Sequence, residues 1–336
     1  MAINSVRGKA HRTLLGFVYR DGKELSKDVK GTYEQIIKKE NTRAIYFLFG
    51  HQIAPFYYRD KEYTKKLLKI IFHNPHDDLL SLSAWEGYLS NNLYYEIFSE
   101  MFMQKLYAAS IGKTVEYPKQ KNFLDPQKGL AGHLALAFMY YPEFSFDNPL
   151  FKRFWESGTS TQQIEFISLI GRNLTSDQDK RYMTKIKQSP DDIVRLQKLW
   201  SLLLSHKHAP DIIESFGYWI GPENDVFDLV WLAKQVKQTM ELTKGKLNWD
   251  YGLTQLITKI AGASPKDTLD ITRLFFNNLI EDSSRHPTER YVEIEWKEAL
   301  NLIYKAGEKE KVKHLIDQLI SKGGRSFWTL KEIIHA

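Results

Sequence analysis

Apolar residues recur at a spacing of three to four along almost the whole chain, and this feature constrains the fold more than any other. At that spacing a helix carries one apolar stripe, whereas a half-buried strand alternates with a period of two. The clearest stripes are Ile193, Leu196, Trp200, Leu203 and Leu204; Val226, Leu229, Val230, Ala233, Val236 and Met240; Leu253, Leu256, Ile257 and Ile260; and Val312, Leu315, Ile316 and Leu319. The pattern predicts an all-α fold.

Helix start and stop signals agree with these stripes. Ser189-Pro190 and Ser264-Pro265 each combine an N-cap serine with a proline at the first helical position. Ser160 with Gln163 resembles a capping box. Glycines that suit a left-handed C-cap stand at the other ends, as Gly112, Gly245, Gly307, Gly323 and Gly324. These signals predict about eighteen short helices joined by loops of a few residues.

Two stretches also fit a strand. Residues 44–49 form a short apolar run, and Val292, Ile294 and Trp296 alternate. We expect helix for both, because the second run continues a helical face through Ala299 and Leu300, beyond the length of a strand.

Many short helices with short links leave two architectures, a helical-repeat solenoid of the HEAT or TPR kind and an irregular bundle. We expect the solenoid, with residues 1–336 as a single array. The eight Trp show no fixed period, so the repeats would be degenerate. The polar segment 113–128, which holds Pro118 and Pro126, marks a soft boundary within the array.

The charge of the chain is unevenly distributed. Residues 1–74 hold 15 Lys and Arg against 7 Asp and Glu, while the remainder holds 32 against 34, within a net charge of +6. A basic segment attracts nucleic acid or an acidic protein surface, although a solvated lysine-rich helix face explains the same pattern. The chain has no Cys, no signal-peptide pattern and no run of eighteen apolar residues. We therefore expect a cytoplasmic protein without a membrane partner.

Motifs for catalysis and for cofactors are missing. Gly112-Lys113-Thr114 lacks the glycine that a phosphate-binding loop needs five residues earlier, where Tyr107 stands. The nucleophile-elbow, zinc-protease and dinucleotide-binding patterns are absent as well, and so is the combination of Ser-x-x-Lys with its partner motifs. Carboxylate pairs occur at Asp191/Asp192 and Glu293/Glu295, as is common on exposed helices. We expect no catalytic residue, no cofactor and no enzyme activity, although a site assembled from distant residues would escape a motif search.

Two histidine clusters have the chemistry of a metal site without its spacing. His73, His76, Asp77 and Asp78 surround Pro75, and the aspartates more simply begin the following helix. His206 and His208 suit the C-terminal end of a helix dipole. We expect no metal.

Aromatic residues are dense in two places, residues 56–58 (Phe-Tyr-Tyr) and residues 140–144 (Tyr-Tyr-Pro-Glu-Phe). Such groups stack bases or anchor a protein partner. Packing between helices is the stronger expectation, so the partner-binding residues stay unknown at this stage.

Three segments carry a family resemblance: the opening INSVRGKAHRTLL, residues 43–46 (RAIY) and residues 82–89 (LSAWEGYL). They resemble the C-terminal helical region of large bacterial proteins of phage defence, mainly STAND or NACHT-type NTPases and SIR2-domain proteins. The ending, with Lys322-Gly323-Gly324 before a short helix that holds Phe327-Trp328, is similar to the way such chains finish. In that family the repeats recognise a phage protein or hold the inactive state, while an N-terminal effector does the chemistry.

The resemblance implies a recognition region, because no NTPase or effector motif is present. Such a region is either an excised piece of a larger protein or a free-standing subunit. We expect a non-enzymatic module that binds a protein, either a phage protein or another domain or subunit of the same system. The alternative is a nucleic-acid-binding HEAT-like protein that uses the basic N-terminal segment.

Overall fold

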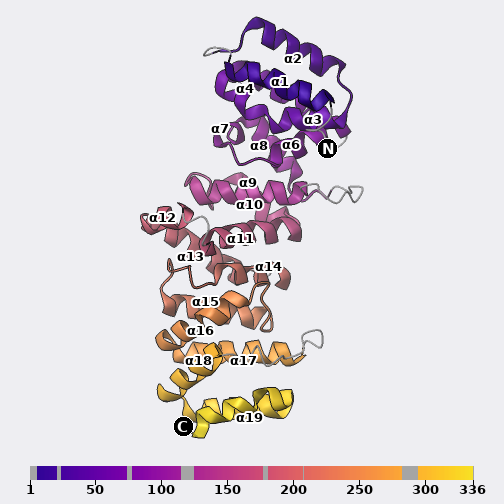
Figure 1. Ribbon diagram of the computed structural model, residues 1–336. Coiled ribbons are helices and arrows are strands. Elements are labelled where there is room, and N and C mark those ends of the chain that lie inside the picture. The colour runs from indigo at the N-terminus through magenta and orange to yellow at the C-terminus, as the bar shows by residue number, and fades with distance from the viewer. Residues whose placement is uncertain are drawn as a thin grey trace. The chain divides into compact units, whose positions relative to one another are not determined.

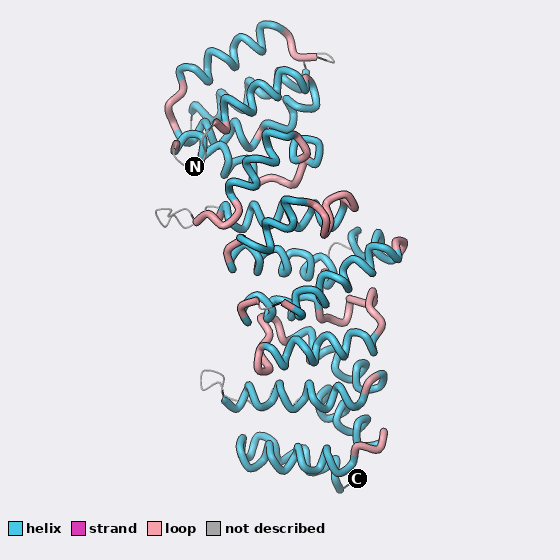
Figure 2. Tube along the Cα trace, turned by 180° about the vertical axis from the view of Figure 1, so that it is seen from behind, coloured by secondary structure: helices cyan, strands magenta, loops and turns pink. Residues whose placement is uncertain are grey.

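A computed structural model describes residues 6–20, 24–73, 78–114, 125–176, 181–206, 208–281 and 294–335. These ranges contain helices and loops and no strand (Figures 1 and 2). They hold twenty α-helices, close to the predicted eighteen. The all-α prediction is therefore confirmed.

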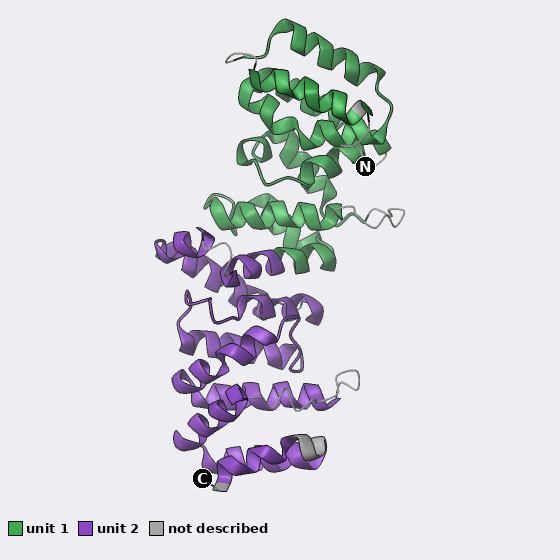
Figure 3. Ribbon diagram, viewed as in Figure 1, with its two compact units in different colours: residues 1–166 green, residues 167–336 purple. Residues whose placement is uncertain are grey.

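The chain packs into two units, residues 1–166 and residues 167–336 (Figure 3). The division falls inside helix α11, Ser160–Thr175, whereas the segment 113–128 lies inside unit 1. A single array with a soft boundary at 113–128 stays a prediction, and residues 115–124 lie outside the described residues.

The helices of unit 1 before α11 are α1 (Val6–Arg20), α2 (Lys27–Lys39), α3 (Arg43–His51), α4 (Ile53–Arg59), α5 (Lys61–Ile71), α6 (Leu79–Leu89), α7 (Tyr95–Phe98), α8 (Met101–Ser110), α9 (Pro126–Tyr140) and α10 (Pro149–Ser157). Those of unit 2 after α11 are α12 (Arg181–Lys187), α13 (Pro190–Ser205), α14 (Pro210–Glu214), the 3-10 helix η1 (Ser215–Trp219), α15 (Leu229–Leu242), α16 (Tyr251–Ala263), α17 (Pro265–Glu281), α18 (Ile294–Lys305), α19 (Lys309–Gly323), the 3-10 helix η3 (Gly324–Lys331) and α20 (Glu332–His335).

Both ambiguous stretches are helical where they are described. Residues 44–49 lie in α3, and Trp296 is fully buried in α18. Ile294 begins α18 with an exposed side chain, and Val292 lies outside the described residues. Helix length and a buried face that extends past Trp296 therefore decide against a strand.

The predicted helix ends are largely confirmed. Helices α13 and α17 begin at Pro190 and Pro265, and Gly112, Gly245 and Gly307 adopt positive φ, as a left-handed C-cap requires. Ser189 occupies the N-cap position of α13, although its side chain makes no capping hydrogen bond.

The predicted capping box is wrong by one residue. Thr159 Oγ1 accepts a hydrogen bond from the Gln162 backbone N–H at 3.2 Å, and Gln162 Oε1 accepts one from the Thr159 N–H at 3.0 Å. Thr159, not Ser160, is therefore the capping residue. The prediction was off by one residue because Thr159 and Ser160 are adjacent and both residue types suit the N-cap position.

Helices α3 and α6 approach each other through glycine. A Cβ added at Gly50 would lie 1.7 Å from the Ala84 carbonyl oxygen, and one added at Gly87 would lie 1.9 Å from that of Phe47. Each helix thus presents a glycine to the other's backbone, and any side chain at either position would force the pair apart.

Unit 1 buries imidazole and phenol groups in its core. His133 Nε2 donates to the Asn91 carbonyl oxygen at 2.9 Å, so Nδ1 of the neutral ring accepts from the Tyr107 hydroxyl. Burial lowers the pKa of His133 to about 4, although the bond to Asn91 opposes the shift.

A second buried imidazole lies in α1. The His11 ring packs edge-on against Tyr33 and Phe49. Burial lowers its pKa to about 4, against weaker opposing effects of Gln52 and Glu40. Neither ring nitrogen of His11 lies in hydrogen-bonding geometry with a described residue.

Unit 2 is built around three fully buried tryptophans. Each indole N–H has an internal acceptor: Trp200 donates to Thr239 Oγ1 at 3.0 Å, Trp219 to the Ile167 carbonyl oxygen at 2.9 Å, and Trp296 to Thr254 Oγ1 at 3.2 Å. The rings therefore supply large apolar surfaces to the core without an unpaired polar atom.

Candidate protein-binding surface

Unit 2 carries a connected group of aromatic side chains at its surface, here called the aromatic row. Its members are Tyr218 at the end of η1, Trp249 in the loop before α16, and Tyr251 at the first position of α16. Trp249 is 48% exposed and Tyr251 is 57% exposed, while Tyr218 is partly buried. Large exposed rings that touch one another set this place apart from scattered single aromatics.

Successive members of the row are in ring contact. The Tyr218 and Trp249 rings are nearly parallel, with centroids 6.1 Å apart, and Trp249 meets Tyr251 edge-on at 6.3 Å. The Arg172 guanidinium of α11 lies over the Tyr218 ring, 5.8 Å from its centroid. Three chain segments thus contribute side chains to one surface: η1, α16 with the loop before it, and α11.

Close backbone contacts hold these segments together. A Cβ at Gly171 would lie 2.7 Å from the Tyr218 backbone, and one at Gly252 would lie 1.9 Å from the Ile220 carbonyl oxygen. Glycine at these two positions lets α11 and α16 pack directly against the backbone of the η1 segment. The glycines therefore help to hold the three segments that carry the row in place.

Hydrogen bonds fix the loop that carries Trp249. The Asn248 backbone N–H donates to the Glu214 carbonyl oxygen at 3.0 Å, and Asn248 Nδ2 donates to Ser215 Oγ at 3.1 Å. Trp219, next to Tyr218, is anchored in the core by its bond to Ile167. The row is therefore pre-organised, which reduces the entropy lost on binding.

Trp, Tyr and Arg are the residue types that dominate the energetics of protein interfaces. Their rings bury a large apolar area with few rotatable bonds, and their polar tips keep hydrogen-bonding capacity. The arrangement can therefore anchor a partner.

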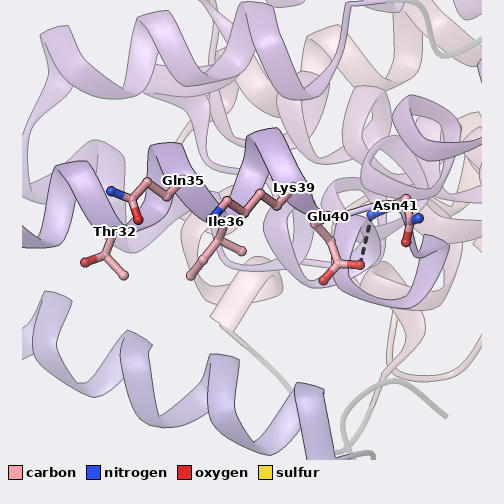
Figure 4. A pocket seen from close by; sticks show the side chains of 6 residues that line it. All are labelled: Thr32, Gln35, Ile36, Lys39, Glu40 and Asn41. Atoms are coloured by element: carbon pink, nitrogen blue, oxygen red, sulfur yellow. Dashed lines mark hydrogen bonds between the residues drawn. The ribbon is translucent and has the colours of Figure 1, made fainter.

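An open depression lies along α2 in unit 1. It measures about 520 Å³, is open to solvent, and is lined by Thr32, Gln35, Ile36, Lys39, Glu40 and Asn41 (Figure 4). Glu40 Oε1 accepts hydrogen bonds from the Asn41 and Thr42 backbone N–H groups, so this carboxylate is engaged in a local turn. The depression therefore has the character of a helix surface and not of a catalytic cleft.

Three of the six aromatic side chains in residues 56–58 and 140–144 lie in the core of unit 1. Phe56, Tyr57 and Phe144 are buried, and the Tyr57 hydroxyl donates to Glu100 Oε1 at 2.5 Å. Tyr58 and Tyr140 are exposed, and Tyr141 stacks on Tyr95 with centroids 3.7 Å apart. Packing between helices, the stronger expectation, therefore accounts for half of these rings.

Only part of the first histidine cluster tested for metal binding lies within the described residues. His73 Nε2 lies 3.9 Å from Asp78 Oδ2, whereas His76 and Asp77 lie outside the described residues. The His206 ring contacts the Leu202 carbonyl oxygen through Nδ1 at 2.7 Å, at the end of α13. Within the described ranges no three His, Asp or Glu side chains gather as a metal site would need.

The remaining motif residues have local structural contacts. Gly112 has φ +76° after the end of α8, and its N–H donates to Gln162 Oε1 at 3.1 Å. Asp192 is buried against Arg195, with Nη2 2.8 Å from Oδ1, which makes that carboxylate part of an ion pair. Asp191 is exposed, and Glu293 lies outside the described residues.

Many basic side chains of the N-terminal segment are exposed, and some of the basic side chains there form ion pairs. Lys30 is paired with Asp60, Arg43 with Glu86, and Lys65 with Glu62 and Glu100. Within the described residues 6–20 and 24–73, nine exposed basic side chains have no such ion pair: Lys9, Arg12, Arg20, Lys27, Lys38, Lys39, Lys61, Lys66 and Lys69. They are spread over α1, α2, α5 and the segments beside them.

No helix in the described ranges combines the length and apolar character needed to cross a bilayer. Comparison with protein-family models, with curated proteins and with solved structures gives no match for this chain.

Proposed function

We propose that this chain is a non-enzymatic protein-recognition module, and that the aromatic row of unit 2 is its main contact surface. The observation that carries the proposal is the row itself: three exposed or partly exposed rings in mutual contact, held by fixed backbone contacts. A few aromatic anchors usually supply most of the affinity of an interface.

The helical fold supports a repeat solenoid of the HEAT or TPR kind, since short helices joined by short loops are typical of such arrays. The resemblance to recognition regions of bacterial defence proteins supports a target-sensing or regulatory role in such a system. The partner would then be a phage protein or another domain or subunit of the same machine, in the bacterial cytoplasm.

Affinity capture tests the proposal. The immobilised chain is exposed to lysates of phage-infected and uninfected bacteria, beside the double variant Trp249→Ala/Tyr251→Ala and the matched control Trp328→Ala. Trp328 is 58% exposed in η3 and is not part of the row. We expect a protein that is retained by the wild type and the control and is lost by the double variant.

Two results contradict the proposal: equal retention of every protein by the double variant, and capture of no protein from either lysate. Enrichment of the retained protein after infection would in addition support the sensing role. Circular dichroism of all three chains checks that the substitutions leave the helices intact.

A nucleic-acid-binding function is the second candidate, and the nine exposed basic side chains of α1, α2 and α5 that have no ion pair among the described residues favour it. Binding of that kind weakens steeply with salt, because each phosphate contact releases counterions. Fluorescence anisotropy with duplex and single-stranded oligonucleotides tests this function. The affinity is measured at salt concentrations from about 50 to about 200 mM, and its logarithm is plotted against the logarithm of the salt concentration. Lys66→Glu/Lys69→Glu should abolish any such binding and leave protein capture unchanged.

A further inference from the structure

The aromatic row offers hydrogen-bond donors beside its ring faces. Tyr251 Oη accepts a bond from Gln255 Nε2 at 3.0 Å, so its own proton can be donated outward. Trp249 has an indole N–H, which is a donor only, on a half-exposed ring. A ligand that suits the row therefore has apolar faces and carbonyl acceptors in alternation.

Peptide-recognition modes differ in the surface that each requires. Strand addition needs an exposed sheet edge, and the described residues contain no sheet. An amphipathic helix needs a groove lined by aliphatic side chains, whereas the row consists of Tyr and Trp. Aromatic surfaces with donor tips are typical of sites for polyproline II segments, whose backbone carbonyls form no internal hydrogen bonds.

Basic residues flank the row at both ends. Arg172 lies over Tyr218 at one end. At the other end Tyr251, Gln255 and Lys259 are all exposed and stand four residues apart, so they share one face of α16. Asp250 lies between Trp249 and Tyr251. Two basic ends and a central carboxylate complement a ligand that has an acidic residue at each end and no acidic residue in its middle.

Nucleic acid would also stack on aromatic rings, but the charge of unit 2 does not favour it. Residues 167–336 hold 25 Lys and Arg against 23 Asp and Glu. Single-stranded nucleic-acid sites combine stacking with a strongly basic channel that follows the phosphates. A nearly neutral unit with a carboxylate inside the row lacks that second component.

We propose that the aromatic row binds an extended, proline-rich segment of a partner protein in the polyproline II conformation, with an acidic residue at each end of the segment. The inference rests on the proposed protein-recognition function and names the chemical class of its partner. Proline rings pack on the exposed rings of Trp249 and Tyr251, while the peptide carbonyls accept from Trp249 Nε1 and Tyr251 Oη.

Fluorescence anisotropy with four labelled probes tests this partner class. The first is a synthetic peptide with a Pro-Pro-x-Pro-Pro centre and a glutamate at each end. The second replaces every proline with alanine, the third replaces both glutamates with glutamine, and the fourth is a single-stranded oligonucleotide of similar length. Each is titrated against the full chain, Trp249→Ala, Tyr251→Ala and the control Trp328→Ala.

We expect the first peptide to bind, and Trp249→Ala to weaken it by about tenfold or more, as loss of an anchor does. The alanine peptide should bind at least about tenfold more weakly, since it loses both the ring contacts and the preformed conformation. The glutamine peptide should lose affinity in the wild type. Trp328→Ala should bind all probes as the wild type does.

Equal affinity for the proline and alanine peptides overturns the proposal, as does binding of the first peptide that is insensitive to Trp249→Ala. Preference for the oligonucleotide overturns it in favour of nucleic acid. If no peptide binds while lysate capture still depends on Trp249 and Tyr251, the partner class is wrong and the protein-recognition function stands. If capture also fails to depend on them, both are wrong.

Discussion

The two units bury polar aromatic groups in different ways. Unit 1 places imidazole rings in its core, His133 bonded to Tyr107 and Asn91, and His11 packed against Tyr33 without a hydrogen bond. Unit 2 uses indoles instead, and each of its three fully buried tryptophans donates to an internal oxygen. Both cores are helical and rich in aromatics, but the two histidines that are buried among the described residues both lie in unit 1.

The difference shows how one fold class can have two responses to its surroundings. An indole N–H keeps its proton over the whole accessible pH range, so its hydrogen bond depends only on packing. A buried imidazole stays neutral as long as the pH is above its pKa, which burial lowers because a buried charge is costly. We therefore expect unit 1 to respond to acid and unit 2 to respond chiefly to the loss of volume.

The largest effect is expected from Trp219→Ala. It removes a fully buried ring and its bond to the Ile167 carbonyl oxygen, which should lower the free energy of unfolding of unit 2 by about 3–5 kcal/mol. Hydrogen exchange read by peptide mass spectrometry should show faster exchange in residues 167–336. Trp328→Ala, at an exposed ring, serves as the control and should leave these rates nearly unchanged. Loss of protection confined to unit 1 would break the comparison.

Acidification should act mainly on unit 1. His11 and His133 have pKa values of about 4 in the fold and about 6.5 when unfolded, so between these values the unfolded state binds more protons. The stabilisation is present above pH 6.5 and is lost as the pH falls toward 4. From pH 7 to pH 5 the loss should be on the order of 1–2 kcal/mol for each histidine.

Hydrogen exchange at pH 7 and pH 5, corrected for the intrinsic rate of exchange, measures this loss unit by unit. In unit 2 burial also lowers the pKa of His208, but that ring is only partly buried and should contribute less. The double variant His11→Gln/His133→Gln should flatten the pH dependence of unit 1. An equal loss in both units of the wild type would refute the assignment.

A smaller and pH-independent effect is expected from Thr239→Val. The substitution keeps the shape of the side chain and removes the oxygen that accepts the Trp200 indole N–H. A buried donor left without an acceptor costs about 1–3 kcal/mol. Urea unfolding at pH 7 and pH 5 should show the same difference from the wild type at both values. A difference that grows at pH 5 would show that the indole core is also coupled to titration.

Sequence patterns predicted the helices because local signals determine them. The stripe of Val312, Leu315, Ile316 and Leu319 is buried throughout, and the glycines at 112, 245 and 307 adopt positive φ. A one-residue error arose at Thr159 and Ser160, where two adjacent residues satisfy the same capping rule and only the three-dimensional geometry distinguishes them.

The aromatic row was not predictable in the same way. Tyr218, Trp249 and Arg172 belong to separate segments, and their ring contacts depend on the close approach permitted at Gly171 and Gly252. No periodic pattern links residues so far apart in sequence. One signal was available in the sequence, the pair Trp249 and Tyr251 on either side of a helix start. Residues at a helix start are buried less often than residues within an apolar stripe, so this pair could have been predicted to be exposed. The dense aromatic segments were the stronger signal in the sequence, and half of their rings are buried.

The paired glycines of α3 and α6 have a consequence for finding relatives of this chain. Backbone oxygens occupy the space where the side chains of residues 50 and 87 would extend, and a backbone atom cannot be exchanged by mutation. Surface residues and even core residues can drift while the volume of a helix interface is preserved. Descendants of a common ancestor should therefore keep both glycines after most other identity has gone. Two glycines at this separation, each within an apolar helical stripe, form a search pattern. Such a pattern can identify a related chain even when its overall sequence identity is low.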